Sequence, residues 1–336
     1  MVERLLQQPV PEGAVDKVGA AKVAIVIPSY RVTRHILDVV SSIPAWVSSI
    51  YVVDDCCPDG SGALVQARCS DPRVVVMFNE VNLGVGGSVM AGYVRAASDG
   101  ADIIVKMDGD GQMDPSLLPR FVAPIASGDA DYTKGNRFYD LTQISQMPRI
   151  RIVGNAGLSF MTKMSSGYWD LFDPTNGYTA IHARLVSALP MEKISKRYFF
   201  ETDILFRLNT LRAVVVDIPM DAKYGDEESG LKIGRIFFDF LSKHFRNAFK
   251  RIFYNYFLRD MSLATIELVG GVALLAGGLI AGAWFWIEAS SLGTTASAGR
   301  VMLAALPLIL GLQLLLGFIA FDIAAVPRRP VHRLLR

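Results

Sequence analysis

Ile-Ile-Val-Lys-Met-Asp-Gly-Asp-Gly-Gln, residues 103–112, is the stretch that decides the fold class. Its first half is a short, mostly apolar run, which is typical of a strand buried on both faces. Its second half is a turn that carries Asp108, Asp110 and Gln112. Residues directly after the carboxyl ends of parallel strands line the ligand crevice of an open α/β sheet. The stretch therefore predicts an α/β domain whose site includes this turn.

Similar apolar runs recur on either side of this stretch. They lie at residues 23–27, 50–53, 74–78 and 214–218. Between them, segments with helical spacing follow turn-forming residues, and these segments lie at residues 34–42, 62–69 and 86–98. Alternating strands and helices predict a mostly parallel sheet with helices on both faces.

Asp108, Asp110 and Gln112 can converge on one divalent cation. Two carboxylates and an amide oxygen are hard ligands, which suit Mg²⁺ or Mn²⁺ shared with the phosphates of a substrate. Asp and Gly are also the commonest turn residues, so the motif taken alone fits a surface turn equally well.

The neighbouring strand ends favour a nucleotide site. The first strand runs into Pro28 and Tyr30, against which a nucleobase can lie, and the second runs into Asp55, whose carboxylate can accept from a base N–H. A glycine-rich turn, Asn-Leu-Gly-Val-Gly-Gly at residues 82–87, follows the third strand. A dinucleotide fingerprint would follow the first strand and have an acidic ribose partner, so the turn argues against a Rossmann dehydrogenase.

Two uncharged runs follow the α/β domain, at residues 268–287 and 301–321. Each is long enough to cross a bilayer as a helix, and 51% hydrophobic residues with a mean hydropathy of +0.32 is high for a soluble protein. A hydrophobic hairpin buried in a soluble core is the alternative. Basic residues flank the pair on both sides, which predicts an integral membrane protein with a cytoplasmic catalytic domain.

Residues 231–260 combine a Phe-rich face with a basic face. This pattern predicts an amphipathic helix in the headgroup layer, in contact with membrane lipid. The alternative is a helix that packs this face on its own domain or on a second subunit. The resulting plan is an extension at residues 1–21, a catalytic domain at 22–230, the amphipathic helix at 231–260, a two-helix anchor at 261–327 and a basic tail at 328–336.

Composition argues against several other classes. Residues 1–21 lack the apolar core of a secretory signal. Cys56, Cys57 and Cys69 have neither disulfide-framework nor zinc spacing, which fits free thiols in a reducing compartment. A net charge of +2 without a basic-aromatic stripe predicts no nucleic-acid partner.

The four motifs at residues 27–30, 52–55, 82–88 and 108–112, in this order, resemble those of family 2 glycosyltransferases of GT-A fold. The branch they resemble contains the dolichol-phosphate mannose synthases and the bacterial polyprenyl-phosphate glycosyltransferases. Nearly the whole chain is covered. Further matches are Gly135-Asn136-Arg137, the segment with Arg149, Arg151 and Asn155, Asp173 to Tyr178, Phe200 to Asp203, and residues 223–232.

This resemblance implies inverting transfer of a hexose, glucose-like or mannose-like, from a nucleotide-sugar to a polyprenyl phosphate at the cytoplasmic membrane face. It also implies a homo-oligomer, for which a tetramer is typical. Tyr30 and Asp55 fit uracil better than guanine. The implied roles are donor binding by Pro28, Tyr30, Asp55, Asp108 and Lys223; metal binding by Asp108, Asp110 and Gln112; acceptor-phosphate binding by Arg137, Arg151 and Asn155; and catalysis by Asp203 and Asp110.

Some positions depart from the family pattern or fit a second interpretation. Cys56 and Cys57 follow the paired aspartates where the family has small polar residues, and Arg31 follows Tyr30. The loop at residues 223–232 has Lys223 in place of Arg, with two inserted acidic residues. Asp203 could equally cap or pair within its own helix.

Three other functions are weighed against these motifs. A processive polysaccharide synthase would carry Gln-x-x-Arg-Trp, and none of the four tryptophans follows that pattern. A nucleotidyltransferase would carry a basic, glycine-rich loop after the first strand, where this chain has Pro-Ser-Tyr. A nucleotide-binding membrane scaffold without activity is opposed by the intact Asp-x-Asp.

Overall fold

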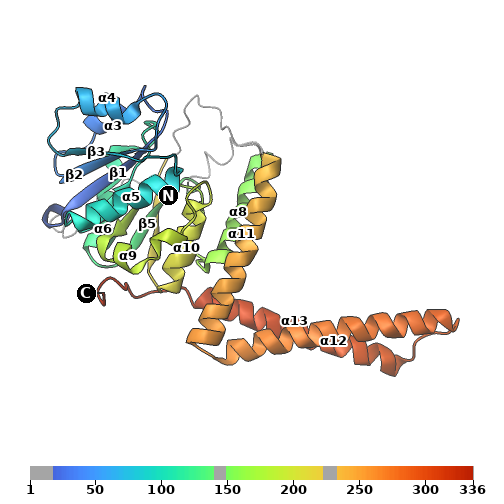
Figure 1. Cartoon of the computed structure of the whole chain (residues 1–336). Coiled ribbons are helices and arrows are strands. Elements are labelled where there is room, and N and C mark those ends of the chain that lie inside the picture. The colour runs from blue at the N-terminus through green and yellow to red at the C-terminus, as the bar shows by residue number, and fades with distance from the viewer. Residues whose placement is uncertain (1–17, 140–148, 222–232, 336) are drawn as a thin grey trace. The chain divides into compact units, whose positions relative to one another are not determined.

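A seven-stranded sheet forms the centre of the fold, with strand order β3-β2-β1-β4-β6-β5-β7 (Figure 1). All neighbours are parallel except β6, which runs antiparallel to β4 and to β5. The strands are β1 (Val23–Ser29), β2 (Ser49–Asp54), β3 (Val74–Phe78), β4 (Ile103–Lys106), β5 (Tyr132–Asn136), β6 (Thr179–His182) and β7 (Val215–Pro219).

This computed structural model describes residues 18–139, 149–221 and 233–335, with the side chains of residues 149–151 and 233–237 left out. It divides into two compact units. The sheet unit comprises residues 1–248 and 327–336, and the helical unit comprises residues 249–326.

Five of the strands coincide with the apolar runs of the sequence, while β5 and β6 were not predicted. The β5 sequence is Tyr-Thr-Lys-Gly-Asn, which is polar, and β6 has only four residues. Both lie inside the sheet with a partner on each side, so tertiary pairing, rather than local propensity, makes them strands.

Helices cover the sheet and carry the predicted helical segments. Those of the sheet unit are α3 (Ile36–Ser41), α4 (Ser61–Arg68), α5 (Val85–Ser98), α6 (Leu118–Ala126), α8 (Arg149–Ser166), α9 (Ala183–Ala188) and α10 (Phe200–Thr210), and α11 (Ile233–Phe253) leads into the helical unit.

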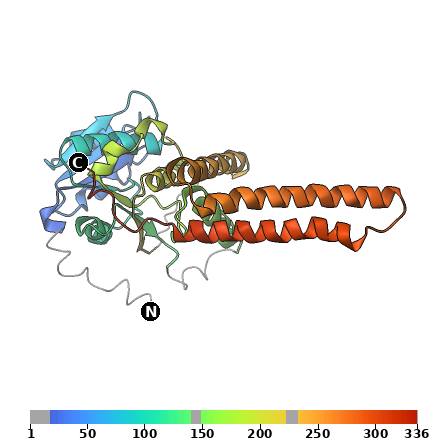
Figure 2. The ribbon, with the colours of Figure 1, turned by 90° about the horizontal axis from the view of Figure 1, so that it is seen from below.

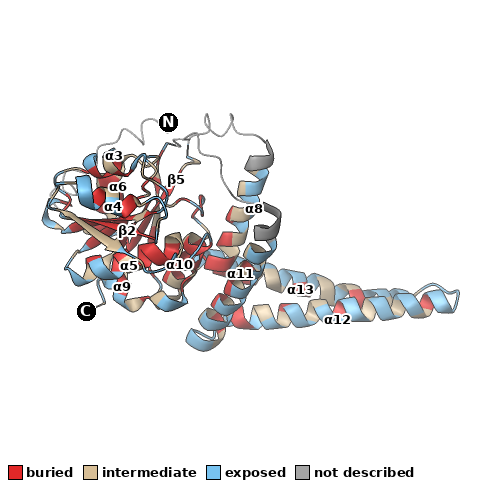
Figure 3. Ribbon diagram, turned by 45° about the horizontal axis from the view of Figure 1, so that its top comes forward, coloured by how far each residue is buried: buried red, intermediate tan, exposed pale blue. Residues whose placement is uncertain are grey.

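The core lies between the sheet and helices α3 and α6, where buried residues gather (Figure 3). Ile25 and Ile27 of β1 are fully buried, and Phe121 of α6 stacks on Tyr178 with ring centroids 4.1 Å apart. Complete burial of such side chains contributes about 1.5–3 kcal/mol each. This packing fixes the β1 and β4 ends, which carry the predicted site.

Helix α11 packs partly on its own domain, as the second interpretation of its sequence expects, while its contact with lipid stays a prediction. His244 and Asn247 are buried and hydrogen-bonded to Ser165 of α8 and Asp203 of α10. Phe238 and Phe245 remain about 70% exposed. The polar buried contacts hold the helix on its own domain, and Phe240 packs against Phe199, whereas Phe238 and Phe245 are left exposed.

The last residues of the chain pack on the sheet unit through Asp131, directly before β5. The fully buried Asp131 carboxylate accepts hydrogen bonds from the backbone N–H groups of Val331 (2.8 Å) and His332 (2.7 Å), and it lies 2.6 Å from His332 Nδ1. The His332 ring stacks on His182 of β6 at 4.2 Å. Burial and the neighbouring His332 lower the pKa of His182 to about 4. The predicted basic tail is thus part of the sheet unit.

The helical unit is dominated by two long antiparallel helices, α12 (Leu263–Ser291) and α13 (Ala298–Ala324), which lie side by side (Figure 2). Both are long and apolar enough to cross a membrane. They pack closely at glycines: a Cβ on Gly271 would lie 3.0 Å from the carbonyl oxygen of Gly311. At the end of α13, the buried Asp322 accepts two hydrogen bonds from Arg251, at 2.6 and 2.9 Å.

Candidate functional site

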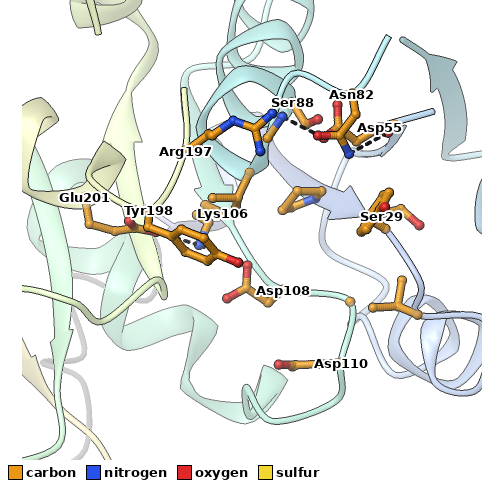
Figure 4. A pocket seen from close by; sticks show the side chains of 16 residues that line it. Ser29, Asp55, Asn82, Ser88, Lys106, Asp108, Asp110, Arg197, Tyr198 and Glu201 are labelled. Atoms are coloured by element: carbon orange, nitrogen blue, oxygen red, sulfur yellow. Dashed lines mark hydrogen bonds and ion pairs between the residues drawn. The ribbon is translucent and has the colours of Figure 1, made fainter. Parts of the chain in front are cut away.

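A cavity of about 550 Å³ opens at the carboxyl ends of β1, β2 and β4. The starts of α5 and α10 complete it (Figure 4). Its polar lining residues include Ser29, Tyr30, Asp55, Asn82, Ser88, Lys106, Asp108, Asp110, Arg197, Tyr198 and Glu201.

Two glycines, Gly109 and Gly111, shape the predicted turn of residues 108–112, part of which lines this cavity. A Cβ on Gly109 would lie 3.1 Å from Ile36 and from Val32, so a larger residue would press on the core. Gly111 has φ +78°, which is a left-handed conformation that disfavours side chains. The turn closes when Asp110 Oδ1 accepts from the Gln112 backbone N–H at 3.0 Å. Asp108 and Asp110 line the cavity, whereas Gln112 does not belong to its lining.

The oxygen chemistry of Asp108 and Asp110 fits a hard divalent cation. Within the described residues, no cluster of three or more His, Cys, Asp or Glu side chains has metal-binding geometry. Two carboxylates alone leave most of a six-coordinate sphere open, which is how Mg²⁺ sites shared with substrate phosphates are built. The residues present therefore fit a cation that is completed by a phosphate-bearing ligand.

Lys106 is a site residue that the sequence analysis did not single out. It is only 1% exposed, and its Nζ lies 2.9 Å from Asp108 Oδ1 and 3.5 Å from Glu201 Oε1. Burial by itself would lower the pKa of Lys106, but the two carboxylates outweigh it and hold the pKa above its ordinary value. Burial raises the pKa of Glu201, and Lys106 offsets only part of this effect. A lysine inside an apolar strand next to an acidic motif was the available signal.

In the segment Asp-Pro-Thr-Asn-Gly, residues 173–177, the site of Gly177 has no room for a side chain. A Cβ on Gly177 would collide with Lys106 Nζ and would lie 2.9 Å from Asp108 Oδ2. The glycine thus leaves the space in which Lys106 reaches Asp108.

Asp54 and Asp55, at the end of β2, have different surroundings. Asp54 accepts from the backbone N–H groups of Cys57 (2.7 Å) and Gly62 (2.6 Å), which fixes the start of α4. Asp55 lines the cavity, and its carboxylate accepts from the backbone N–H groups of Leu83 and Gly84, both at 2.8 Å. In this structure the Asp55 oxygens therefore position the glycine-rich turn.

The glycine-rich turn packs against the segment that precedes α10. Gly84 has φ +83°, and a Cβ there would lie 2.6 Å from the carbonyl oxygen of Lys196. The Gly87 N–H donates to that same oxygen at 3.1 Å. This close approach brings Arg197 and Tyr198 to the cavity, two residues that the sequence analysis did not single out.

Asp203 and Glu201 both lie on α10, but their side chains point in different directions. Asp203 accepts from the Ser195 N–H and the Asn247 side chain, both at 2.8 Å, and it is absent from the lining of the cavity. Glu201 lines the cavity beside Lys106 (Figure 4). Asp203 thus bonds mainly to groups outside its own helix, with only a longer 3.8 Å ion pair to Arg207 within it, whereas Glu201 reaches the Lys106 ammonium beside Asp108. A catalytic role for Asp203 stays a prediction.

Arg137 lies outside the cavity lining and pairs with the buried Asp173. Its Nε and Nη2 donate to the two Asp173 oxygens at 2.7 and 3.0 Å. Burial alone would raise the pKa of Asp173, but the hydrogen bonds from Arg137 outweigh it and lower the pKa. Asn155 lies half-buried on α8. The Arg151 side chain and all of Lys223 lie outside the described residues.

Comparison with known proteins assigns the family. Residues 24–189 match the profile of glycosyl transferase family 2. The undecaprenyl-phosphate mannosyltransferase of Micrococcus luteus is 33% identical over 175 residues, which cover 52% of this chain and 71% of that protein. This chain is a family 2 glycosyltransferase.

Other relatives of this glycosyltransferase bear related names. The polyprenol monophosphomannose synthase of Mycolicibacterium smegmatis is 28% identical over 201 residues, which cover 58% of this chain and 75% of that protein. A UDP-N-acetylglucosamine–dolichyl-phosphate N-acetylglucosaminyltransferase of Methanococcus voltae is 27% identical, with 60% of this chain and 85% of that protein covered.

Solved structures agree on the fold of this glycosyltransferase. Glucosyl-3-phosphoglycerate synthase of Mycobacterium tuberculosis, in complex with UDP, has a TM-score of 0.54 at 16% identity, with 70% of this chain and 83% of that chain covered. Mannosyl-3-phosphoglycerate synthase of Rubrobacter xylanophilus has the same score and identity, with 76% and 82% covered. The predicted GT-A fold is confirmed.

Proposed function

We propose that this glycosyltransferase moves a hexose from a nucleotide-sugar, with UDP preferred to GDP, to a polyprenyl phosphate, with inversion at the sugar. The observation that carries the proposal is the cavity in which Asp108 and Asp110 face the β1 and β2 ends. Support for the acceptor comes from the relatives, since three of them are named for transfer to undecaprenyl, polyprenol or dolichyl phosphate carriers.

The donor would occupy the cavity, with its base against Pro28 and Tyr30 and its diphosphate near Asp108. Mg²⁺ or Mn²⁺ would be held by Asp108 and Asp110, with Gln112 adjoining. When bound, the cation neutralises the charge that develops on the departing diphosphate. A related structure of the same fold, glucosyl-3-phosphoglycerate synthase, contains Mn²⁺ and UDP-glucose. UDP is preferred because Tyr30 and Asp55 suit uracil.

The acceptor phosphate is anionic at neutral pH, so positioning matters more than deprotonation. A phosphate oxygen attacks the anomeric carbon while the bond to the nucleoside diphosphate breaks. Arg137, oriented by Asp173, offers a planar fork that suits a phosphate, and Arg151 and Asn155 would assist it. Glu201 takes the acidic position beside the reacting centre that the sequence assigned to Asp203.

The apolar surfaces of α11, α12 and α13 support a lipid acceptor. Helices α12 and α13 would anchor the chain, and the exposed phenylalanines of α11 would enter the headgroup layer on the cytoplasmic side. The same apolar surfaces would let copies of the chain assemble, as a tetramer in the branch that the sequence resembles.

Purified protein in detergent, polyprenyl phosphate, Mn²⁺ and a panel of UDP- and GDP-sugars test the proposal. We expect one lipid-linked sugar, extracted into organic solvent, and its loss in Asp110→Ala. Absence of any lipid-linked sugar from a folded protein that binds UDP or GDP would refute the lipid acceptor. A polymer in place of a single sugar would favour a processive synthase.

A further inference from the structure

The Lys106 side chain is buried and lies next to two carboxylates. Lys106 is the last residue of β4, where it pairs with Val26 of β1 and Thr179 of β6. Its ammonium is buried, and a buried ammonium is stable only when paired and hydrogen-bonded. Asp108 at 2.9 Å and Glu201 at 3.5 Å supply this pairing. Lys106 thereby connects the Asp-Gly-Asp turn to helix α10.

The position of Lys106 has a consequence for Asp108. One carboxylate oxygen, Oδ1, already faces the ammonium, whereas Asp108 remains 30% exposed toward the cavity. A divalent cation on Asp108 would lie within a few ångströms of the ammonium, and like charges at this distance repel strongly in a partly buried site. The diphosphate of a donor carries negative charges that offset this repulsion.

We propose that Lys106 is a positioning residue that holds Asp108 in place and makes tight binding of the divalent cation depend on the nucleotide diphosphate. The inference rests on the metal site of the proposed function. Two further observations support it. Gly177 leaves room for the Lys106–Asp108 pair, and among the described residues no third His, Cys, Asp or Glu side chain joins Asp108 and Asp110, so the protein alone supplies few charged ligands.

Binding of Mn²⁺, followed by electron paramagnetic resonance in the full-length protein, tests the proposal without turnover. The wild type should bind Mn²⁺ weakly alone and at least about tenfold more tightly with UDP or GDP. In Lys106→Met, Mn²⁺ alone should bind at least about tenfold more tightly than to the wild type, and the nucleotide should add correspondingly less.

The loss of Lys106 could also leave Glu201 buried without a partner and prevent folding. The double variant Lys106→Met/Glu201→Gln removes both charges and keeps the shapes, so it should fold and should show the same reduced dependence of Mn²⁺ on nucleotide. Lys134→Met is the matched control. Lys134 is equally buried, on β5, and pairs with Asp217 outside the cavity, so its loss should leave this dependence unchanged.

The results separate the inference from the proposed function. Unchanged dependence of Mn²⁺ on nucleotide in the folded single or double variant would overturn the role of Lys106 and leave the proposed metal site intact. A wild type that binds no Mn²⁺ with either nucleotide would overturn both. A similar change in Lys134→Met would show that the effect belongs to any buried lysine, and it would also overturn the inference.

Discussion

Arg137 and Asp173 form a two-point ion pair, with Nε–Oδ2 and Nη2–Oδ1 distances of 2.7 and 3.0 Å. Asp173 also accepts from the Arg137 backbone N–H at 3.2 Å. The Asp173 side chain is buried, whereas the Arg137 side chain is 31% exposed. The buried Asp173 carboxylate therefore holds the partly exposed Arg137 guanidinium in one orientation.

Asp173→Asn should weaken acceptor binding. The amide keeps the size of the carboxylate but loses its charge, so Arg137 is held less firmly and orients a phosphate less well. We expect the KM for polyprenyl phosphate to rise by about tenfold, with donor affinity measured by calorimetry unchanged. Arg95→Gln, which removes an exposed surface ion pair with Asp99, serves as the control and should change neither quantity. A lower donor affinity with unchanged acceptor KM would contradict the assignment.

Gly177→Ala should damage activity far more than stability. The added methyl group would displace Lys106 and Asp108, and displacements of about 1 Å at a reacting centre cost on the order of a hundredfold in rate. The measurement is kcat/KM for the nucleotide-sugar together with the thermal midpoint. Gly299→Ala, in the first turn of α13 with open space around its Cα, should leave kcat/KM at the wild-type value. Full activity in Gly177→Ala would show that the close contact is not required.

Stability should fall as the pH decreases below about 6.5 because of His244. Burial lowers the pKa of His244 to about 4, compared with about 6.5 in the unfolded chain. Between these values the unfolded chain binds the proton and the folded one does not, so the free energy of unfolding decreases as the pH falls through this window. His244 should contribute roughly 1–2 kcal/mol to the loss between pH 7 and pH 5, and His182, whose pKa is also lowered to about 4, should add to it.

Thermal midpoints in detergent at pH 5, 6, 7 and 8 measure this effect. His244→Gln keeps a polar group for Ser165 and does not titrate, so its midpoint should depend less on pH than that of the wild type. An unaltered pH dependence would exclude His244 as its source.

Asp131→Asn should release the end of the chain. Asp131 accepts backbone N–H groups from Val214, Val331 and His332, and an amide can satisfy fewer of these donors. Loss of a buried, charged acceptor costs about 1–3 kcal/mol. We expect a lower thermal midpoint and faster tryptic cleavage at Arg333, detected by mass spectrometry. Equal cleavage rates in variant and wild type would mean that Asp131 does not hold the tail.

The fold and much of the site could be predicted because most strands are short apolar runs and the polar residues that follow the parallel ones lie at one edge of the sheet. Apolar runs located five strands, and their endings placed Tyr30, Asp55, Asp108 and Asp110 in one cavity. The roles of Asp203 and Glu201 could not be separated in this way, since both lie in the first turn of α10 and only the packing of α11 and Ser195 decides which faces the cavity. Lys106 was missed for a related reason. The role of Lys106 can be seen only from its contact with Glu201, which lies 95 residues further along the chain.

The contact between His332 and Asp131 affects when the sheet unit can finish folding during synthesis. The two hydrophobic helices lie between parts of one folding unit, so the sheet unit is interrupted by them in the chain. A ribosome releases residues 327–336 only after α12 and α13 have been made. Asp131, directly before β5, therefore acquires its partners Val331 and His332 only once the whole helical hairpin has left the ribosome. A fragment ending at residue 248 would lack them permanently.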